Sequence, residues 1–248
     1  MQNLYKRFGG LEATKDLNFQ VTRGEILGIL GPNGAGKTTV FNQIAGSLKP
    51  TYGTILFNGQ DITGRKAHEI ANRGLARTFQ IPKPLHSLTV LENVLIPCHS
   101  MRTVTSLGSR KQTEEWALNV LRLAELENRA RLPVEQLTHG ELKKLELAKA
   151  LALKPELVLL DEPFAGLSVS EVGPLSALIR RLNEEHGLTV IIIEHKLREF
   201  MKLVHRVIVL NYGEKIAEGA PSDIIKNALV IEAYLGKGGA ALADTGST

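Results

Sequence analysis

The residues best suited to chemistry lie together at positions 31–38, which read GPNGAGKT. This stretch fits the pattern G-x-x-x-x-G-K-[ST] of a phosphate-binding loop. Glycine tolerates tight backbone turns, so such a loop can aim several N–H groups at phosphate oxygens. Lys37 would reach the β- and γ-phosphates, and the Thr38 hydroxyl would hold Mg²⁺. The sequence therefore predicts a site for a nucleoside triphosphate and Mg²⁺.

The flanking residues must form the elements that position this loop. The apolar run at 25–30 predicts a buried strand before it, and the spacing at 39–45 predicts a helix after it. A helix N-terminus carries a partial positive charge and exposes N–H groups, so it favours an anion. The residues expected to surround the phosphates are Gly31, Asn33, Gly34, Ala35, Gly36, Lys37, Thr38 and Thr39.

Two carboxylates follow a second apolar run, Leu157 to Leu160. Such a run predicts a buried parallel strand. Asp161 and Glu162 at its end would be costly to bury without a cation or hydrogen-bond donors. With a phosphate loop upstream, Mg²⁺ is the natural partner of Asp161, and Glu162 could act as the general base for an attacking water.

Four further residues allow two interpretations each. His195 ends another apolar run, and it is either a histidine at the edge of the core or a group that senses the γ-phosphate. Thr138 and Glu141 form a capping box, so Thr138 and Gly140 either only begin a helix or also hold an anion there. Phe8 suits a core position as well as a platform for a nucleotide base.

The composition excludes several classes of protein. The 248 residues are 43% hydrophobic and 23% charged, with a net charge of +4, and no basic run predicts a nucleic-acid partner. The single cysteine, Cys98, allows no internal disulfide and indicates a reducing compartment with Cys98 as inert packing. No run approaches the roughly 18–20 apolar residues of a membrane span, so a membrane role would depend on a partner.

The fold class predicted is α/β, with a mostly parallel sheet, an N-terminal antiparallel β subdomain and an inserted α-helical subdomain. We expect a single domain over 1–235, with the helical insertion at about 81–150 and a disordered Gly/Ala-rich tail at 236–248. Capping patterns predict helices after Thr138 and after Ser168. Further segments are predicted as a strand at 17–21, a hairpin around Asn58-Gly59, a helix at 62–73, a strand at 75–80, a helix at 113–126 and a closing hairpin at 206–219.

The order of these motifs resembles the ATP-binding cassette (ABC) ATPases of membrane transporters. The resemblance covers about 3–235 and includes the phosphate loop, Gln80, the stretch 137–141, the strand end at 161–162 and His195. It implies that Phe8 stacks on adenine and that Gln80 contacts both Mg²⁺ and the membrane partner. It also implies that 137–141 is the signature motif, Glu162 the catalytic glutamate and His195 the switch histidine.

In this family two cassettes pair head to tail, and each ATP lies between one phosphate loop and the other subunit's signature helix. Finer matches, such as those at 7–11, 76–80, 216–219 and 232–236, are similar to the branched-chain amino-acid permease type. That implies transmembrane permease subunits, a second ATP-binding subunit (the same chain or a paralogue) and, indirectly, an external solute-binding protein. The expected location is peripheral, on the cytoplasmic face of the inner (cell) membrane.

Some residues depart from the family pattern. The common signature is LSGGQ, whereas Thr138, His139 and Glu141 stand here, and Ser168 replaces the usual Asp after Gly166-Leu167. The first strand is also short at Met1, as if a few residues were absent. The alternatives are a cassette for urea or amides, for aromatic acids or for lipopolysaccharide export. Less favoured are a soluble ABC protein, which usually has two cassettes or a coiled coil, a P-loop kinase, and a GTPase, which needs an N-K-x-D motif not found here.

Overall fold

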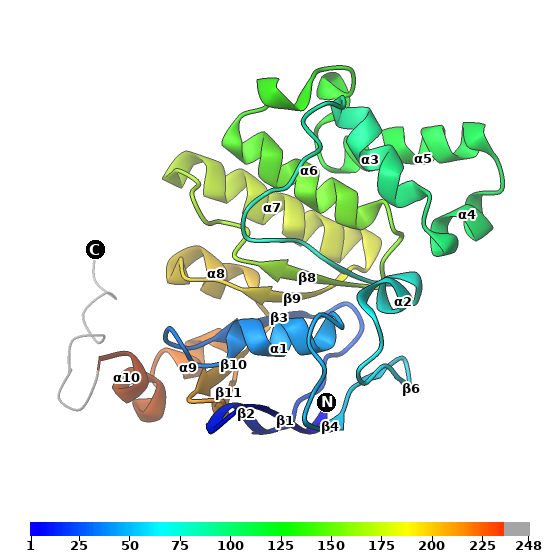
Figure 1. The fold of residues 1–248 in the computed structure, drawn as a ribbon. Helices are drawn as coiled ribbons and strands as arrows, with labels where there is room; N and C mark the ends of the chain where they lie inside the picture. The colour runs from blue at the N-terminus through cyan, green and yellow to red at the C-terminus, as the bar shows by residue number, and fades with distance from the viewer. Residues whose placement is uncertain (236–248) are drawn as a thin grey trace. The chain divides into compact units, whose positions relative to one another are not determined.

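The computed structural model describes residues 1–235 and divides the chain into two compact units. Unit 1 comprises 1–66 and the described residues from 191 onward, and unit 2 comprises 67–190. Figure 1 labels their helices and strands. The tail predicted to be disordered, 236–248, lies outside the described residues.

An antiparallel sheet forms the N-terminal part of unit 1, as predicted. Its strand order is β2-β1-β4, with β1 at Gln2–Phe8, β2 at Leu11–Leu17 and β4 at Tyr52–Thr54. A short hairpin follows, β5 (Leu56–Phe57) and β6 (Gln60–Asp61), joined by Asn58 and Gly59 at φ 50° and 75°. Two successive residues with positive φ are the requirement of the tight hairpin turn that Asn-Gly predicts.

The strand that precedes the phosphate loop lies in a second, mixed sheet. This strand, β3 (Ile26–Leu30), is buried along its whole length and pairs in parallel with β10 (Arg206–Asn211). β10 in turn pairs antiparallel with β11 (Glu214–Gly219), as predicted for the closing hairpin. The helices of unit 1 are α1 (Lys37–Ile44), α8 (Leu197–Leu203), α9 (Pro221–Ile224) and α10 (Ala228–Leu235).

Unit 2 combines a pair of parallel strands with helices. β7 (Leu75–Arg77) pairs with β8 (Leu157–Asp161), and the boundary between the units passes through β9 (Thr189–Ile193). The helices α6 (His139–Leu151) and α7 (Val169–His186) contact each other (Figure 1). Cys98 is buried, and burial raises the pKa of its thiol to about 11, which agrees with inert packing. The helices are α2 (Ala67–Asn72), α3 (Val90–Cys98), α4 (Met101–Leu107), α5 (Arg110–Leu123), α6 (His139–Leu151) and α7 (Val169–His186).

Four predictions of secondary structure were wrong in their limits. The strand expected at 17–21 ends at Leu17, because the Asn18 side chain takes over backbone hydrogen bonds to Asn3 and Asp16. The helix expected at 62–73 is only α2, since Gly64 adopts φ 65° just before it. The strand expected at 75–80 ends at Arg77, and the helix expected at 113–126 covers 110–123.

In the described part of the chain, none of the helices combines the length and apolar character that crossing a bilayer requires.

Candidate functional site

The phosphate loop of unit 1 is held in place by contacts that only glycine permits. A Cβ on Gly31, at φ 150°, would lie 2.2 Å from the Leu210 carbonyl oxygen. A Cβ on Gly36, at φ 101°, would lie 2.3 Å from the Ala13 carbonyl oxygen. Both distances are far below van der Waals contact, so glycines at the two ends of the motif fix the loop against neighbouring backbone.

Lys37 lies inside this loop. Its side chain is buried, and Nζ donates hydrogen bonds to the carbonyl oxygens of Gly31 at 2.7 Å and Pro32 at 3.0 Å. The amino group is therefore held at the loop and not in open solvent. In the same loop Ala35 is buried, whereas Asn33, Gly34 and Thr38 are exposed.

The first turn of α1 fits a polyphosphate. Its N-cap is Gly36, which has no side chain to accept hydrogen bonds from the first N–H groups, and the turn contains no acidic residue. Those N–H groups, Lys37 and the hydroxyl groups of Thr38 and Thr39 are what a phosphate group requires. The residues present therefore fit the triphosphate that the sequence predicts.

Asp161 and Arg77 form an ion pair at the paired strands of unit 2. Arg77 Nη2 lies 2.7 Å from Asp161 Oδ2, and both side chains are only about a tenth exposed. The parallel register aligns Arg77 with Leu159, two residues before Asp161. Arg77 also lies over the ring of Phe79, 5.6 Å from its centroid. The ion pair leaves the other Asp161 oxygen, Oδ1, for a cation, so Asp161 still fits a role as a Mg²⁺ ligand.

Gln80 and Glu162 are brought together. Gln80 Nε2 donates a hydrogen bond of 2.6 Å to Glu162 Oε2. Glu162 adopts φ 47°, which is unusual for a residue with a Cβ and often marks a functional constraint. The sequence predicted both residues as functional, but it predicted that the Gln80 side chain would contact Mg²⁺ and did not predict its hydrogen bond to the Glu162 carboxylate.

Lys143 joins this pair from the helix α6. The Lys143 side chain is buried, and Nζ donates 2.6 Å to the Gln80 carbonyl oxygen and lies 3.4 Å from the Glu162 carbonyl oxygen. Sequence reasoning missed it, although Lys143 precedes buried Leu147 by four residues, which places both on one face of the helix. That spacing was the available signal.

Thr138 begins α6 as predicted. Its side chain accepts a hydrogen bond from Glu141 N–H, while Glu141 Oε2 accepts one from Thr138 N–H at 2.8 Å. Gly140 packs tightly against α7, since a Cβ there would lie 3.0 Å from Glu171 Oε1. Hydrogen bonds from the Ser168 hydroxyl and N–H in turn lower the pKa of Glu171. The two unusual positions, Thr138 and Ser168, therefore begin neighbouring helices.

His139, the bulkiest departure from the common signature, has a definite place in unit 2. Its Nε2 lies 3.3 Å from the Ala165 carbonyl oxygen, and a Cβ on Gly166 would come within 2.7 Å of the same nitrogen. The imidazole thus lies against the turn that precedes Ser168, where the common glycine would leave space.

His195 and Phe8 are exposed positions of unit 1. The backbone N–H groups of His195 and Lys196 both donate to the buried carboxylate of Glu194, at 2.9 and 3.2 Å, which fixes the turn after β9. Phe8 is 48% exposed at the end of β1, with Lys6 Nζ 5.1 Å from its ring centroid. The core alternative for Phe8 is therefore wrong, and about half of its surface is exposed to solvent.

Comparisons with known proteins give one consistent result. Residues 14–165 match the family model for ABC transporters, and residues 214–240 match the model for branched-chain amino acid ATP-binding cassette transporters. The chain is 36% identical to the high-affinity branched-chain amino acid transport ATP-binding protein BraF of Pseudomonas aeruginosa, over 96% of this chain and 97% of that one. It is 35% identical to the lipopolysaccharide export system ATP-binding protein LptB of Acidithiobacillus ferridurans, over 95% of each chain.

Solved structures agree in fold. The ADP conformation of an ATP-binding cassette of an ABC transporter matches with a TM-score of 0.86 at 32% identity, over 95% of this chain and 97% of that one. A dimeric cassette in a post-hydrolysis state, bound to ADP and Pi, matches with a TM-score of 0.76 at 30% identity, over 89% of this chain and 97% of that one. The α/β fold predicted from the sequence is thus confirmed.

Proposed function

The chain belongs to the ABC transporter family, as the motif order predicted, and from that premise we propose that it is the ATPase subunit of an importer for branched-chain or other hydrophobic amino acids. One observation carries the nucleotide part of this proposal: the loop at 31–38 is fixed at both of its ends, with Lys37 held inside it. The match at 214–240 and the likeness to BraF support the transported class.

Each polar group then has a chemical role. The loop N–H groups and Lys37 bind the phosphates, and Thr38, Gln80 and Asp161 supply oxygen ligands for Mg²⁺. When bound, Mg²⁺ neutralises charge on the phosphate oxygens. Glu162 takes the proton of the attacking water, and His195 contacts the γ-phosphate side. The exposed Phe8 ring stacks on adenine, which is worth about 1–3 kcal/mol.

The working assembly contains a second cassette, identical or paralogous. Thr138 and Gly140 at the N-terminus of α6 meet the γ-phosphate bound by that second subunit. A related cassette solved as a dimer supports this arrangement. ATP then joins the two subunits, and its hydrolysis releases them.

Transmembrane permease subunits are the second kind of partner, with a solute-binding protein acting through them. Three large apolar side chains in unit 2, Phe79, Ile81 and Leu85, are between 49% and 71% exposed next to Gln80. Exposed apolar residues in one short segment mark an interaction site. This segment and the helical residues at 81–150 would hold a permease loop, and the chain would then lie at the cytoplasmic face of the cell membrane.

The catalytic part is tested by Glu162→Gln in the purified chain. Loss of a general base costs about 10²- to 10⁴-fold in rate. Turnover of ATP should fall by that factor while ATP binding persists, and ATP should then drive dimerisation. Normal steady-state hydrolysis in this variant would remove Glu162 from its role.

The transported solute needs a separate test, because the likeness to LptB supports lipopolysaccharide export as a second candidate. Uptake of labelled leucine, isoleucine and valine should fall in cells that lack the chain and return when it is supplied. Unchanged uptake together with lipopolysaccharide retained at the inner membrane would favour the second candidate.

A further inference from the structure

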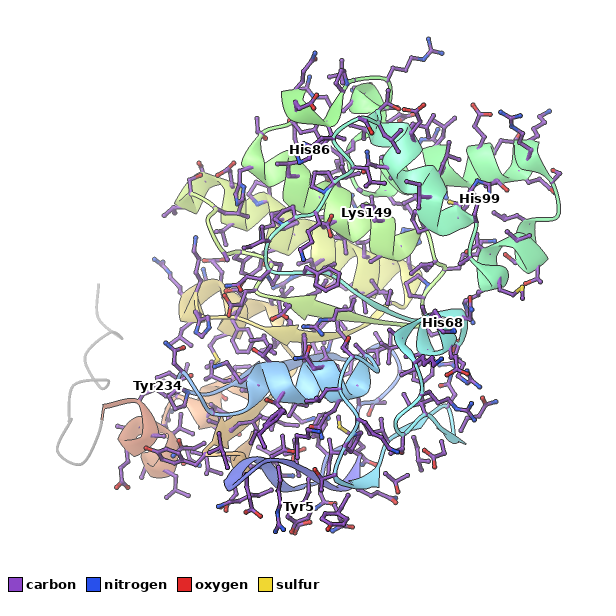
Figure 2. All side chains as sticks on the ribbon, viewed as in Figure 1. Tyr5, His68, His86, His99, Lys149 and Tyr234 are labelled. Atoms are coloured by element: carbon purple, nitrogen blue, oxygen red, sulfur yellow. The ribbon has the colours of Figure 1, made fainter. Side chains whose placement is uncertain are left out.

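The first residue of the phosphate loop is held from two sides. The Gly31 N–H donates a hydrogen bond of 2.8 Å to the hydroxyl oxygen of Tyr234, and the Gly31 carbonyl accepts one of 2.7 Å from Lys37 Nζ. Gly31 thus links the Tyr234 hydroxyl to the amino group of Lys37, the lysine expected to bind phosphate. Figure 2 labels Tyr234 near the loop that leads into α1.

Tyr234 belongs to α10, a helix that unit 1 holds in place. Asn227 begins this helix, and its side-chain oxygen accepts hydrogen bonds from the N–H groups of Leu229 and Val230. Val230 is buried. Burial also raises the pKa of the Tyr234 phenol to about 12, against the opposing effect of the Gly31 hydrogen bond. The phenol is therefore neutral at physiological pH, and its oxygen remains an acceptor for the backbone N–H.

The backbone of Gly31 adopts a conformation that only glycine tolerates. Its φ of 150° is open to glycine but not to residues with a Cβ, and the Leu210 carbonyl blocks any larger side chain. The backbone at Gly31 is therefore intrinsically permissive, and hydrogen bonds from side chains must select one orientation. Tyr234 fixes the N–H side of this residue and Lys37 the carbonyl side.

We propose that Tyr234 is a positioning residue for the phosphate loop, through which nucleotide binding and the docking of α10 stabilise each other. The inference rests on the proposed function, in which this loop binds ATP. It assigns a role to α10, which lies within residues 214–240, the stretch that matches the branched-chain cassette model. Coupling between two sites is reciprocal. If the docking of α10 strengthens nucleotide binding, bound nucleotide must stabilise the docking of α10 by the same free energy.

The decisive variant is Tyr234→Phe in the full-length chain, which removes the hydroxyl and keeps the ring. A neutral hydrogen bond contributes about 0.5–1.5 kcal/mol, which converts to a roughly two- to thirteenfold change in affinity. The Kd for Mg·ATP and for Mg·ADP, measured by calorimetry, should rise by a factor in this range. KM for ATP should rise in parallel, with kcat within twofold of the parent, because Tyr234 acts on binding and not on the reacting atoms. Tyr52→Phe, which removes a hydroxyl from an exposed tyrosine of the same unit, is the matched control and should leave Kd unchanged.

Amide hydrogen exchange distinguishes positioning from simple stabilisation. Mg·ADP should slow exchange in 228–234 of the parent chain, and this protection should shrink in Tyr234→Phe. A lower melting temperature with unchanged Kd and unchanged protection would show a merely structural hydroxyl and overturn the inference. Failure of the parent chain itself to bind nucleotide would instead overturn the proposed function, so the two failures are distinguishable.

Discussion

Replacing Lys143 by methionine should slow ATP hydrolysis while leaving ATP binding nearly intact. Methionine keeps most of the length and apolar contact of the lysine stem but removes the donor group. In the structure that group donates to the Gln80 carbonyl at 2.6 Å and lies 3.4 Å from the Glu162 carbonyl. The substitution therefore acts on the backbone of both residues that are expected to handle the attacking water.

The magnitude follows from the two distances. A hydrogen bond from a charged group contributes about 1.5–3 kcal/mol, and only the 2.6 Å contact has favourable length. If all of that energy serves to position Gln80 and Glu162 in the transition state, kcat falls by about 10- to 150-fold, since 1.36 kcal/mol is tenfold in rate. KM for ATP should change by less than about threefold, because the Lys143 amino group acts on the backbone of Gln80 and Glu162, which are expected to handle the attacking water. Lys143→Arg should recover part of the loss.

The assay is steady-state phosphate release at saturating Mg·ATP, with ATP affinity and melting temperature measured on the same preparations. Lys144→Met is the matched control: it lies next along α6, and its amino group pairs with Glu125 at 2.6 Å, away from Gln80 and Glu162. A kcat within twofold of the parent in folded Lys143→Met would refute the positioning argument. Equal losses in the two lysine variants would also refute it, since a general weakening of α6 would then suffice.

Three shorter predictions concern other contacts. Gly36→Ala should abolish nucleotide binding in calorimetry and lower the melting temperature, because its Cβ would meet the Ala13 carbonyl at 2.3 Å. In Gly34→Ala the new Cβ meets no atom within 4 Å, so the free energy of unfolding should fall only by the positive-φ penalty of about 1–2 kcal/mol. Phe8→Ala should weaken ATP binding by about 5- to 150-fold, and Phe8→Trp should not. The folded pKa of Glu171 lies below its ordinary value of 4.5, so its stabilisation is present above that pH and is lost as pH falls through the folded pKa. In urea titrations Glu171→Gln should therefore destabilise the chain at pH 7, and the difference from the parent should shrink below about pH 4.5.

The parts of the site that could be predicted are those set by local chemistry. The backbone of the loop at 31–38 has positive φ at Gly31, Gly34 and Gly36, and this local requirement for glycine can be recognised from the sequence pattern alone. The same holds for Thr138, whose capping box involves only Glu141, three residues on. Buried strands such as the one at 157–160 can also be predicted from the sequence, because a strand covered on both faces must be apolar throughout.

The contacts that escaped prediction depend on segments far apart in the chain. Arg77 meets Asp161 across 84 residues, and Lys143 meets the Gln80 carbonyl across 63. A charged residue on a predicted helix is ordinarily a solvated one, so only its spacing relative to Leu147 indicates that Lys143 is buried. The helix expected at 62–73 starts later than predicted for a different, local reason. Apolar spacing continued through Gly64, where the backbone takes a positive φ that no helix has.

Lys143 also gives α6 a double role. Thr138 stands at the first turn of this helix, and Lys143 lies little more than one turn further on, so both are fixed to one rigid element. In the proposed dimer the Thr138 end meets the nucleotide of the opposite subunit, while Lys143 holds the backbone of Gln80 and Glu162 in its own subunit. A displacement of α6 at the dimer contact must therefore act on the local catalytic pair. Lys143→Met should consequently weaken cooperativity. The Hill coefficient for ATP hydrolysis should fall toward one in Lys143→Met and stay at the parent value in Lys144→Met. If Lys143→Met is folded and slow but keeps the parent Hill coefficient, the two ends of α6 act independently.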